Sequence, residues 1–114
     1  MSTVAIQLDP GRMTNPDLDI RYELPDAISA HSPLLLADDG YDYGRTSNRI
    51  TLFLRTSDLA AAVPLVLKAL EKEIMGNSLL QEGVVVATAA SDHCEVEQEY
   101  TVVFPSESAS FSFE

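Results

Sequence analysis

The stretch Asn48 to Met75, NRITLFLRTSDLAAAVPLVLKALEKEIM, joins a strand pattern to the longest helical pattern in the chain. From Arg49 to Thr56, aliphatic residues alternate with Thr51, Phe53 and Arg55. This is the period of a strand with one face turned inward. The inward set is Ile50, Leu52 and Leu54. The stretch therefore predicts a strand followed by a helix, and we expect it to supply most of the core.

The helical half follows a capping signal. We expect Ser57 to be the N-cap, with Asp58 at the positive end of the helix dipole and Gly76 as the stop. Apolar residues recur at spacings of three and four, which predicts a single apolar stripe. Its members are Leu59, Val63, Leu67, Leu70 and Ile74.

Pro64 is incompatible with a regular helix because it removes the hydrogen bond to the Ala60 carbonyl. Either the helix is kinked at this position or its regular part begins near Ala61 or Ala62. We favour the kink.

Before this stretch, Thr3 to Leu8 has a strand pattern and is followed by the turn residues Asp9-Pro10-Gly11. Asn15 resembles an N-cap, and we expect two short helices, 16–23 and 25–31, separated by Pro25. An extended Ile20 to Leu24 is the competing interpretation, because its apolar residues also alternate.

Three further strands are predicted. Leu34 to Tyr43 should bend at Asp39-Gly40 and form a hairpin with the strand at Arg49 to Thr56. Gly83 to Ala90 is apolar on both faces, as expected of a central strand. Glu95 to Phe104 alternates clearly between acidic and apolar residues.

The expected order is thus β-α-β-β-α-β plus an extra C-terminal strand. Its first six elements resemble the ferredoxin-like fold, a split βαβ sandwich in which two helices cover one face of an antiparallel sheet. This resemblance rests on element order and implies no functional residue. We expect 1–105 to be a single α+β domain and the Ser-rich 106–114 to be a flexible C-terminal tail.

Composition narrows the class of protein. The chain has 114 residues, of which 46% are hydrophobic, as in a globular domain. No apolar run approaches the roughly 20 residues of a membrane span, and the first residues lack a signal-peptide pattern. Cys94 is the single cysteine, which excludes an internal disulfide and fits a reducing compartment. We expect a cytoplasmic protein without a membrane partner.

The net charge is −11, and the last basic residue is Lys72. Nucleic-acid binding is disfavoured because Lys and Arg contacts to phosphate supply most of its affinity. The negative charge indicates either simple solubility or attraction to a protein with a basic surface.

Glu95, Glu97 and Glu99 are the first candidate partner-binding residues. On a strand they would point the same way, roughly 7 Å apart, and form an acidic ladder on the outer sheet face. The alternative is a solvated face or edge whose charges discourage strand pairing.

A second candidate group surrounds Gly40: Asp38, Asp39 and Asp42. Because they lack the spacing of a calcium loop, we favour a solvated bend over a metal site. Tyr41 and Tyr43 should share the side opposite Asp42.

On the next strand, an exposed Phe53 would suit a dimer interface. Arg55 would pair with a glutamate of the last strand if those strands were neighbours.

Catalytic chemistry has little support. Asp92, His93 and Cys94 are adjacent, and adjacent residues rarely converge on one metal. A nucleophile pair of Cys94 with His93 or His31 would need spatial proximity that the sequence does not give. We expect no enzyme activity, no metal and no cofactor.

The leading hypothesis is a small, acidic, non-enzymatic protein-binding domain, in its specific form an immunity or antitoxin-like inhibitor of a basic partner. The alternative is a homodimeric ferredoxin-like domain with a ligand-binding or regulatory role.

Overall fold

The computed structural model describes residues 1–31, 34–91, 95–106 and 109–114. They form an α+β architecture, a five-stranded antiparallel sheet with two α-helices. The strands are β1 (Ser2–Leu8), β2 (Ala37–Tyr43), β3 (Ile50–Thr56), β4 (Val85–Ala89) and β5 (Thr101–Phe104). The helices are α1 (Ile20–His31) and α2 (Leu59–Leu70), with short 3-10 helices η1 (Pro10–Arg12) and η2 (Glu97–Glu99).

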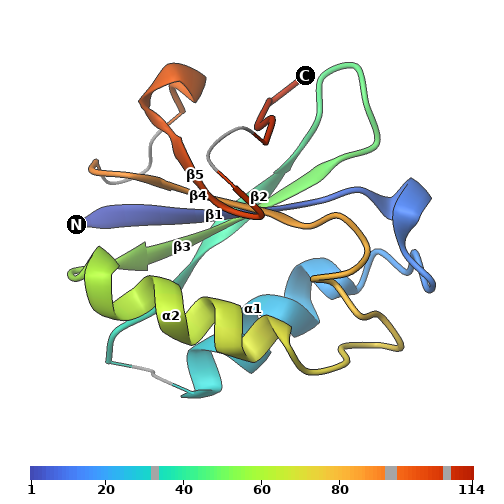
Figure 1. The fold of residues 1–114 in the computed structure, drawn as a ribbon, viewed down its shortest axis with the longest axis horizontal. Helices are drawn as coiled ribbons and strands as arrows, with labels where there is room; N and C mark the ends of the chain where they lie inside the picture. Colours follow the sequence, from blue (N-terminus) through green and yellow to red (C-terminus); the bar gives the residue numbers. More distant parts are fainter. Residues whose placement is uncertain (32–33, 92–94, 107–108) are drawn as a thin grey trace.

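Both α-helices lie on the same face of the sheet (Figure 1). Of the helices described, none combines the length and the apolar character that a membrane crossing requires.

The first strand lies in the middle of the sheet. The strand order is β2-β3-β1-β4-β5, and all neighbours are antiparallel. Ile6 lies opposite Leu52 on β3 and opposite Val86 on β4. A strand pairs with β1 on each side, and other parts of the chain cover both of its faces. All six residues from Thr3 to Leu8 are therefore buried. The interior position predicted for 83–90 is confirmed by the pairing of β4 with both β1 and β5.

The hydrophobic core fills the space between the sheet and the helices. Alternate residues of the three inner strands face the helices, as the period of two predicts. Burial of each aliphatic side chain contributes about 1.5–3 kcal/mol. Fully buried members of this core are Val4, Ile6, Ile20, Leu24, Leu52, Leu54, Val66 and Val86.

Helix α2 begins one residue later than predicted. Its N-cap is Asp58, whose Oδ1 accepts a hydrogen bond from the Ala61 N–H at 3.2 Å, whereas Ser57 is exposed. The helix then continues through Pro64, so a start near Ala61 is wrong. Ala60 and Pro64 are both exposed, and water can therefore solvate the carbonyl that the proline leaves without a partner.

The apolar stripe of α2 is also displaced. Leu70 is buried as predicted, but Leu59, Val63 and Leu67 are only half-buried. The remaining buried positions of the helix are Ala62, Val66 and Ala69. The small alanines face the sheet, and the larger leucines cover the sides of the contact.

The predicted continuation of α2 to Gly76 is wrong, because the helix ends at Leu70. Ile74 to Asn77 form a tight turn closed by backbone hydrogen bonds of 3.0 and 2.9 Å. Its central residues, Met75 and Gly76, have φ values of 52° and 81°, as a type I′ turn requires. The buried Asn77 side chain ties this turn to a distant segment, and that tertiary anchor outweighs local helix propensity.

Helix α1 is a single helix with Pro25 inside it, so both the two-helix and the extended predictions are wrong. A proline inside a helix costs about 3 kcal/mol. Three side chains spaced by four residues are fully buried along α1: Ile20, Leu24 and Ile28. Their burial contributes about 1.5–3 kcal/mol each, and the three together exceed the cost of the proline.

The predicted β2–β3 hairpin and its bend are confirmed. The register between the strands shifts between Asp38 and Tyr41, and Gly40 takes a φ of 94° that favours glycine. β2 begins at Ala37, however, and not at Leu34.

The predicted strand from Glu95 to Phe104 is wrong in its first half. Only Thr101 to Phe104 pair with β4, and Glu97 to Glu99 form the 3-10 turn η2. Since β4 ends at Ala89, the residues before Thr101 have no neighbouring strand on which to continue. The glutamate ladder is therefore absent from the described structure.

Two polar side chains fix the connector between α2 and β4. Asn77 is fully buried, and its Oδ1 accepts from the Asn15 N–H at 2.7 Å while its Nδ2 donates to the Asn15 carbonyl at 2.9 Å. Glu82 accepts from the Thr14 N–H at 3.0 Å, the Thr14 hydroxyl at 3.2 Å and the Ser78 N–H at 2.7 Å. These bonds hold segment 13–17 against segment 75–82.

The Glu82 contacts predict a pH-dependent contribution to stability. Burial acts to raise the pKa of Glu82, but the hydrogen bonds from Thr14 and Ser78 outweigh it and the pKa lies below 4.5. The unfolded state thus binds a proton more readily, so this stabilisation is present above about pH 4.5 and is lost as pH falls through the folded pKa. We expect Glu82→Gln to reduce the free energy of unfolding at pH 7 by about 0.5–1 kcal/mol, since the site is open to solvent.

Urea unfolding of both proteins at pH 7, 5, 4 and 3 checks this expectation. The difference between wild type and variant should shrink below about pH 4.5. A difference that stays constant down to pH 3 would contradict the role of the ionised carboxylate.

Candidate functional site

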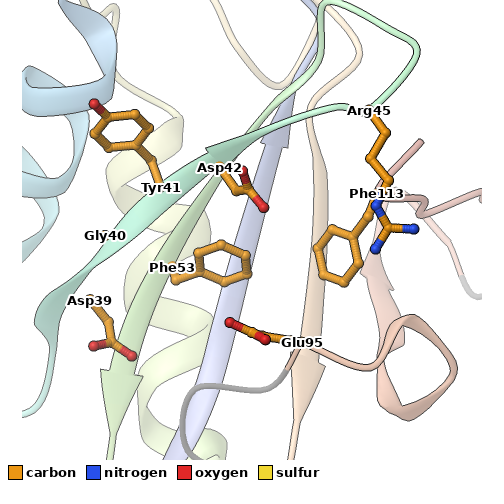
Figure 2. Close-up of a pocket in the computed structure, with 8 residues that line it drawn as sticks. All are labelled: Asp39, Gly40, Tyr41, Asp42, Arg45, Phe53, Glu95 and Phe113. Carbon is orange, nitrogen blue, oxygen red and sulfur yellow. The ribbon is translucent and has the colours of Figure 1, made fainter.

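A groove of about 430 Å³ lies over β2 and β3, on the sheet face opposite the helices (Figure 2). We call it the acidic groove, and its lining is Asp39, Gly40, Tyr41, Asp42, Arg45, Phe53, Glu95 and Phe113. These residues come from the β2–β3 hairpin, the segment before η2 and the segment 109–114.

The bulge in β2 sets the direction of its side chains. The Asp38 carboxylate accepts from the Gly40 N–H at 3.0 Å, a local bond that stabilises the turn at positive φ. Beyond the bulge, Asp42 faces the groove while the Tyr41 side chain points away from it (Figure 2). The edge strand therefore offers acidic groups on one face and tyrosines on the other.

The floor of the groove is aromatic. Phe53 lies on the outer face of β3, as predicted, and its ring centroid is 6.1 Å from that of Phe113. Phe113 in turn contacts Tyr100 at 5.8 Å and Phe111 at 5.2 Å. Tyr100 and Phe111 are 4.8 Å apart, so the four rings form a continuous layer over the sheet.

The segment 109–114 makes this layer possible because hydrogen bonds hold it against the sheet. Gln7 Nε2 donates to the Ser112 carbonyl at 2.6 Å, and the Arg45 N–H donates to the Phe113 carbonyl at 3.0 Å. The Phe113 N–H donates to Glu97 Oε1 at 2.8 Å. In the sequence, the only apolar aromatic residues of the Ser-rich stretch 106–114 that indicate such contacts are Phe111 and Phe113.

Negative charge dominates the groove. Asp39, Asp42 and Glu95 contribute three carboxylates, and Arg45 contributes the cation. Arg45 pairs with Glu114 at 3.3 Å, with both side chains more than half exposed, at 69% and 59%. Such an exposed pair adds little stability but offsets the positive charge of Arg45. The groove consequently attracts cations.

The structure brings together four of the seven predicted partner-binding residues: Asp39, Asp42, Phe53 and Glu95. Asp38 instead holds the bulge, and Glu97 holds Phe113. Glu99 is exposed on η2 and does not line the groove.

Three tyrosines and an arginine cluster on the other face of β2. Tyr41 lies 5.7 Å from Tyr43, which confirms their predicted common side, and 6.0 Å from Tyr22 on α1. The Arg21 guanidinium carbon is 4.5 Å from the centre of the Tyr22 ring, a cation–π contact. Hydrogen bonds from Tyr41 and then from Arg21 lower the pKa of Tyr22. All three tyrosines are exposed.

The remaining chemical candidates of the sequence lie largely outside the described residues. Asp92, His93 and Cys94 lie outside the described residues, as does the side chain of His31. Within the described ranges, no three His, Cys, Asp or Glu side chains are grouped to hold a metal ion. Arg55 cannot meet a glutamate of the last strand across the sheet, because β1 and β4 separate β3 from β5.

Comparison with known proteins adds no functional residue. No protein-family model, curated protein or solved structure matches the chain.

Proposed function

We propose that the chain is a non-enzymatic protein-binding domain whose acidic groove takes a lysine or arginine side chain of a basic partner. The observation that carries the proposal is the convergence of Asp42 and Glu95, from distant parts of the chain, on the ring of Phe53. A basic side chain has an apolar stem and a charged head. In this groove the stem would lie on the Phe53 and Phe113 rings, and the head would meet the carboxylates.

The tyrosine cluster supports the same kind of partner. Tyr and Arg are enriched in protein interfaces, where large rigid side chains supply most of the binding energy. β2 is an edge strand, and its two faces carry the acidic groove and the cluster of Tyr22, Tyr41 and Tyr43. A partner that grips this edge would contact both.

The specific partner that we propose is a protein with a basic functional surface, of the nuclease type, which this chain would occlude as an immunity or antitoxin-like inhibitor. The net charge of −11 supports this version, since long-range attraction accelerates association with a basic surface. Binding of this kind weakens as salt rises.

We also propose that the fold is ferredoxin-like. What supports this is the order β-α-β-β-α-β together with the strand order β2-β3-β1-β4, in which each helix connects parallel strands separated by one antiparallel strand. β5 would then be an addition at the β4 edge.

The homodimeric alternative has less support. It uses the outer sheet face, where Phe53 and Tyr100 already contact Phe113 of the same chain. A second copy seated on that face would have to displace 109–114, whereas a basic side chain can enter the groove as it stands.

Neutralising the groove tests the proposal. The test variant is Asp39→Asn/Asp42→Asn/Glu95→Gln, and the probe is a short amidated peptide with arginine at alternate positions. Exposed charge pairs contribute about 0.3–1 kcal/mol each, so removing three should weaken binding by about fivefold to 150-fold. Fluorescence anisotropy at two salt concentrations measures the dissociation constant.

The matched control is Asp26→Asn/Glu71→Gln/Glu73→Gln, which changes the net charge equally at exposed positions in or next to the helices. We expect it to weaken binding by less than about twofold. A citrulline analogue of the peptide, which keeps its shape without its charge, should not compete. Equal weakening by the two triple variants would leave only a general effect of net charge and would refute a groove.

A further inference from the structure

A second pocket, of about 410 Å³, lies where β1, β4 and β5 meet the segment 109–110. We call it the arginine pocket. Its polar lining includes Gln7, Asp9, Arg12, Arg49, Gln81 and Ser110. Its apolar lining includes Leu8, Leu80, Val84, Val85, Phe104 and Pro105.

Two arginines, Arg12 and Arg49, line this pocket. Acidic residues outnumber basic ones by 18 to 7, so a cation can easily find a carboxylate partner. Arg45 has such a partner in Glu114. Within the described ranges, the guanidiniums of Arg12 and Arg49, like the ammonium groups of Lys68 and Lys72, have neither an ion pair nor a hydrogen bond.

Local structure holds Arg12 in place at this pocket. Arg12 is the last residue of η1, and its N–H donates to the Asp9 carbonyl at 2.9 Å. The Asp9 carboxylate is engaged by the Gly11 N–H at 3.0 Å, which caps the same turn. The Asp9 carboxylate is thus already hydrogen-bonded to the backbone of η1.

Gly83 provides the surface on which Arg12 lies. A Cβ atom at this position would be 2.6 Å from Arg12 Nη1 and 2.7 Å from its Cζ, so the guanidinium would have to shift if a larger residue replaced glycine. Gly83 also has a φ of 90°, which L side chains rarely adopt. Both the backbone conformation and the nearby guanidinium therefore favour glycine at position 83.

We infer that the arginine pocket binds a small organic monocarboxylate with an apolar body. Among the described lining residues, the two guanidiniums of Arg12 and Arg49 outnumber the carboxylate of Asp9. Arginine suits a carboxylate because its planar fork can donate two parallel hydrogen bonds. The overall charge of −11 repels multiply charged ligands, which favours a monoanion over a phosphate dianion. The aliphatic and aromatic wall accounts for the apolar body.

This pocket is distinct from the acidic groove in charge and in position. Ala109 and Ser110 line the arginine pocket, and Phe113, three residues further, lines the acidic groove. The proposal is independent of the basic partner, because its ligand has the opposite charge and its test uses other residues.

A titration with hexanoate, followed by amide NMR, tests the inference. We expect saturable shifts confined to the pocket, with the amides of Gln7, Gly83 and Ser110 as reporters. Arg12→Gln/Arg49→Gln should weaken binding at least tenfold. The matched control Lys68→Gln/Lys72→Gln removes the same charge from exposed positions and should change binding less than twofold. If the double variant does not fold, Arg12→Gln against Lys68→Gln makes the same comparison at an exposed side chain.

Two further ligands sharpen the assignment. Hexan-1-ol has the same apolar body without charge, and binding as tight as that of hexanoate would overturn a role for the arginines. Tighter binding of hexyl phosphate than of hexanoate would overturn the carboxylate assignment. An absence of saturable shifts with hexanoate, or equal weakening by the arginine and lysine variants, would overturn the pocket itself.

Discussion

Replacing Ile6 by alanine is expected to lower the free energy of unfolding by about 3.5 kcal/mol, within the range for large-to-small changes in a core. Ile6 is fully buried in the central strand, between Leu52 on one neighbour and Val86 on the other. Truncation removes its buried surface and leaves a cavity between the sheet and the helices. Because paired strands hold β1 on both sides, the backbone cannot move to close that cavity.

Chemical denaturation with urea measures this loss, and Val103→Ala is the matched control. Val103 lies on β5 at the edge of the sheet and is exposed, so its truncation should cost less than about 1 kcal/mol. A loss below about 1.5 kcal/mol for Ile6→Ala would show that the core around β1 relaxes more than its packing implies.

The second large effect is expected at Asn77, where alanine should cost about 3 kcal/mol. The Asn77 side chain is fully buried and bonds both the N–H and the carbonyl of Asn15. Removing it leaves backbone polar groups without partners, and each such group costs about 1–3 kcal/mol when it stays away from water. Partial hydration of segment 13–17 limits the total loss of free energy of unfolding.

Urea unfolding of Asn77→Ala, with Asn48→Ala as the matched control, checks this expectation. Asn48 is an exposed residue of the hairpin loop, and its replacement should change stability by less than about 0.5 kcal/mol. Asn77→Asp adds information, because it keeps the Oδ1 acceptor for the Asn15 N–H and loses the donor to the Asn15 carbonyl. If Asn77→Ala proves as mild as Asn48→Ala, the connector is not held by this side chain.

The parts of the fold that were predictable are those whose signal is local. The alternation of Ile50, Leu52 and Leu54 predicted β3 and its inward face, and all three are buried. The bend at Asp39-Gly40 was predictable because glycine permits a backbone conformation that other residues avoid. The α+β class followed from these elements and their order.

The errors arose where a distant contact overrides a local pattern. Glu95 to Phe104 alternates like a strand, yet its first half has no neighbour beyond the end of β4 at Ala89. Gly76 looked like the end of α2, but the Asn77 anchor turns the chain earlier. Pro25 looked like a break, but burial along one side of α1 outweighs it. Neither the length of β4 nor the position of Asn15 can be predicted from the local sequence around these residues.

The candidate site was predictable in part for the same reason. Asp39, Asp42 and Phe53 belong to one hairpin, so their proximity follows from local structure. Phe113 joins them only through the long-range bonds of 109–114. The available signal was the spacing of Phe111 and Phe113, two aromatic residues at a period of two in an otherwise polar stretch. Arg12 and Arg49 line one pocket because β1 and the β2–β3 hairpin bring distant loops to one end of the sheet.

The central position of β1 has a consequence for how the chain folds during synthesis. β1 is made before the strands that pair with it, which begin at Ile50 on one side and Val85 on the other. Closing such long loops is entropically costly, and chains dominated by distant contacts fold slowly. Until β3 emerges, the apolar residues of β1 have no partner and are exposed to other chains, the situation in which chaperones act. Expression at low temperature or with a chaperone should therefore raise the soluble yield.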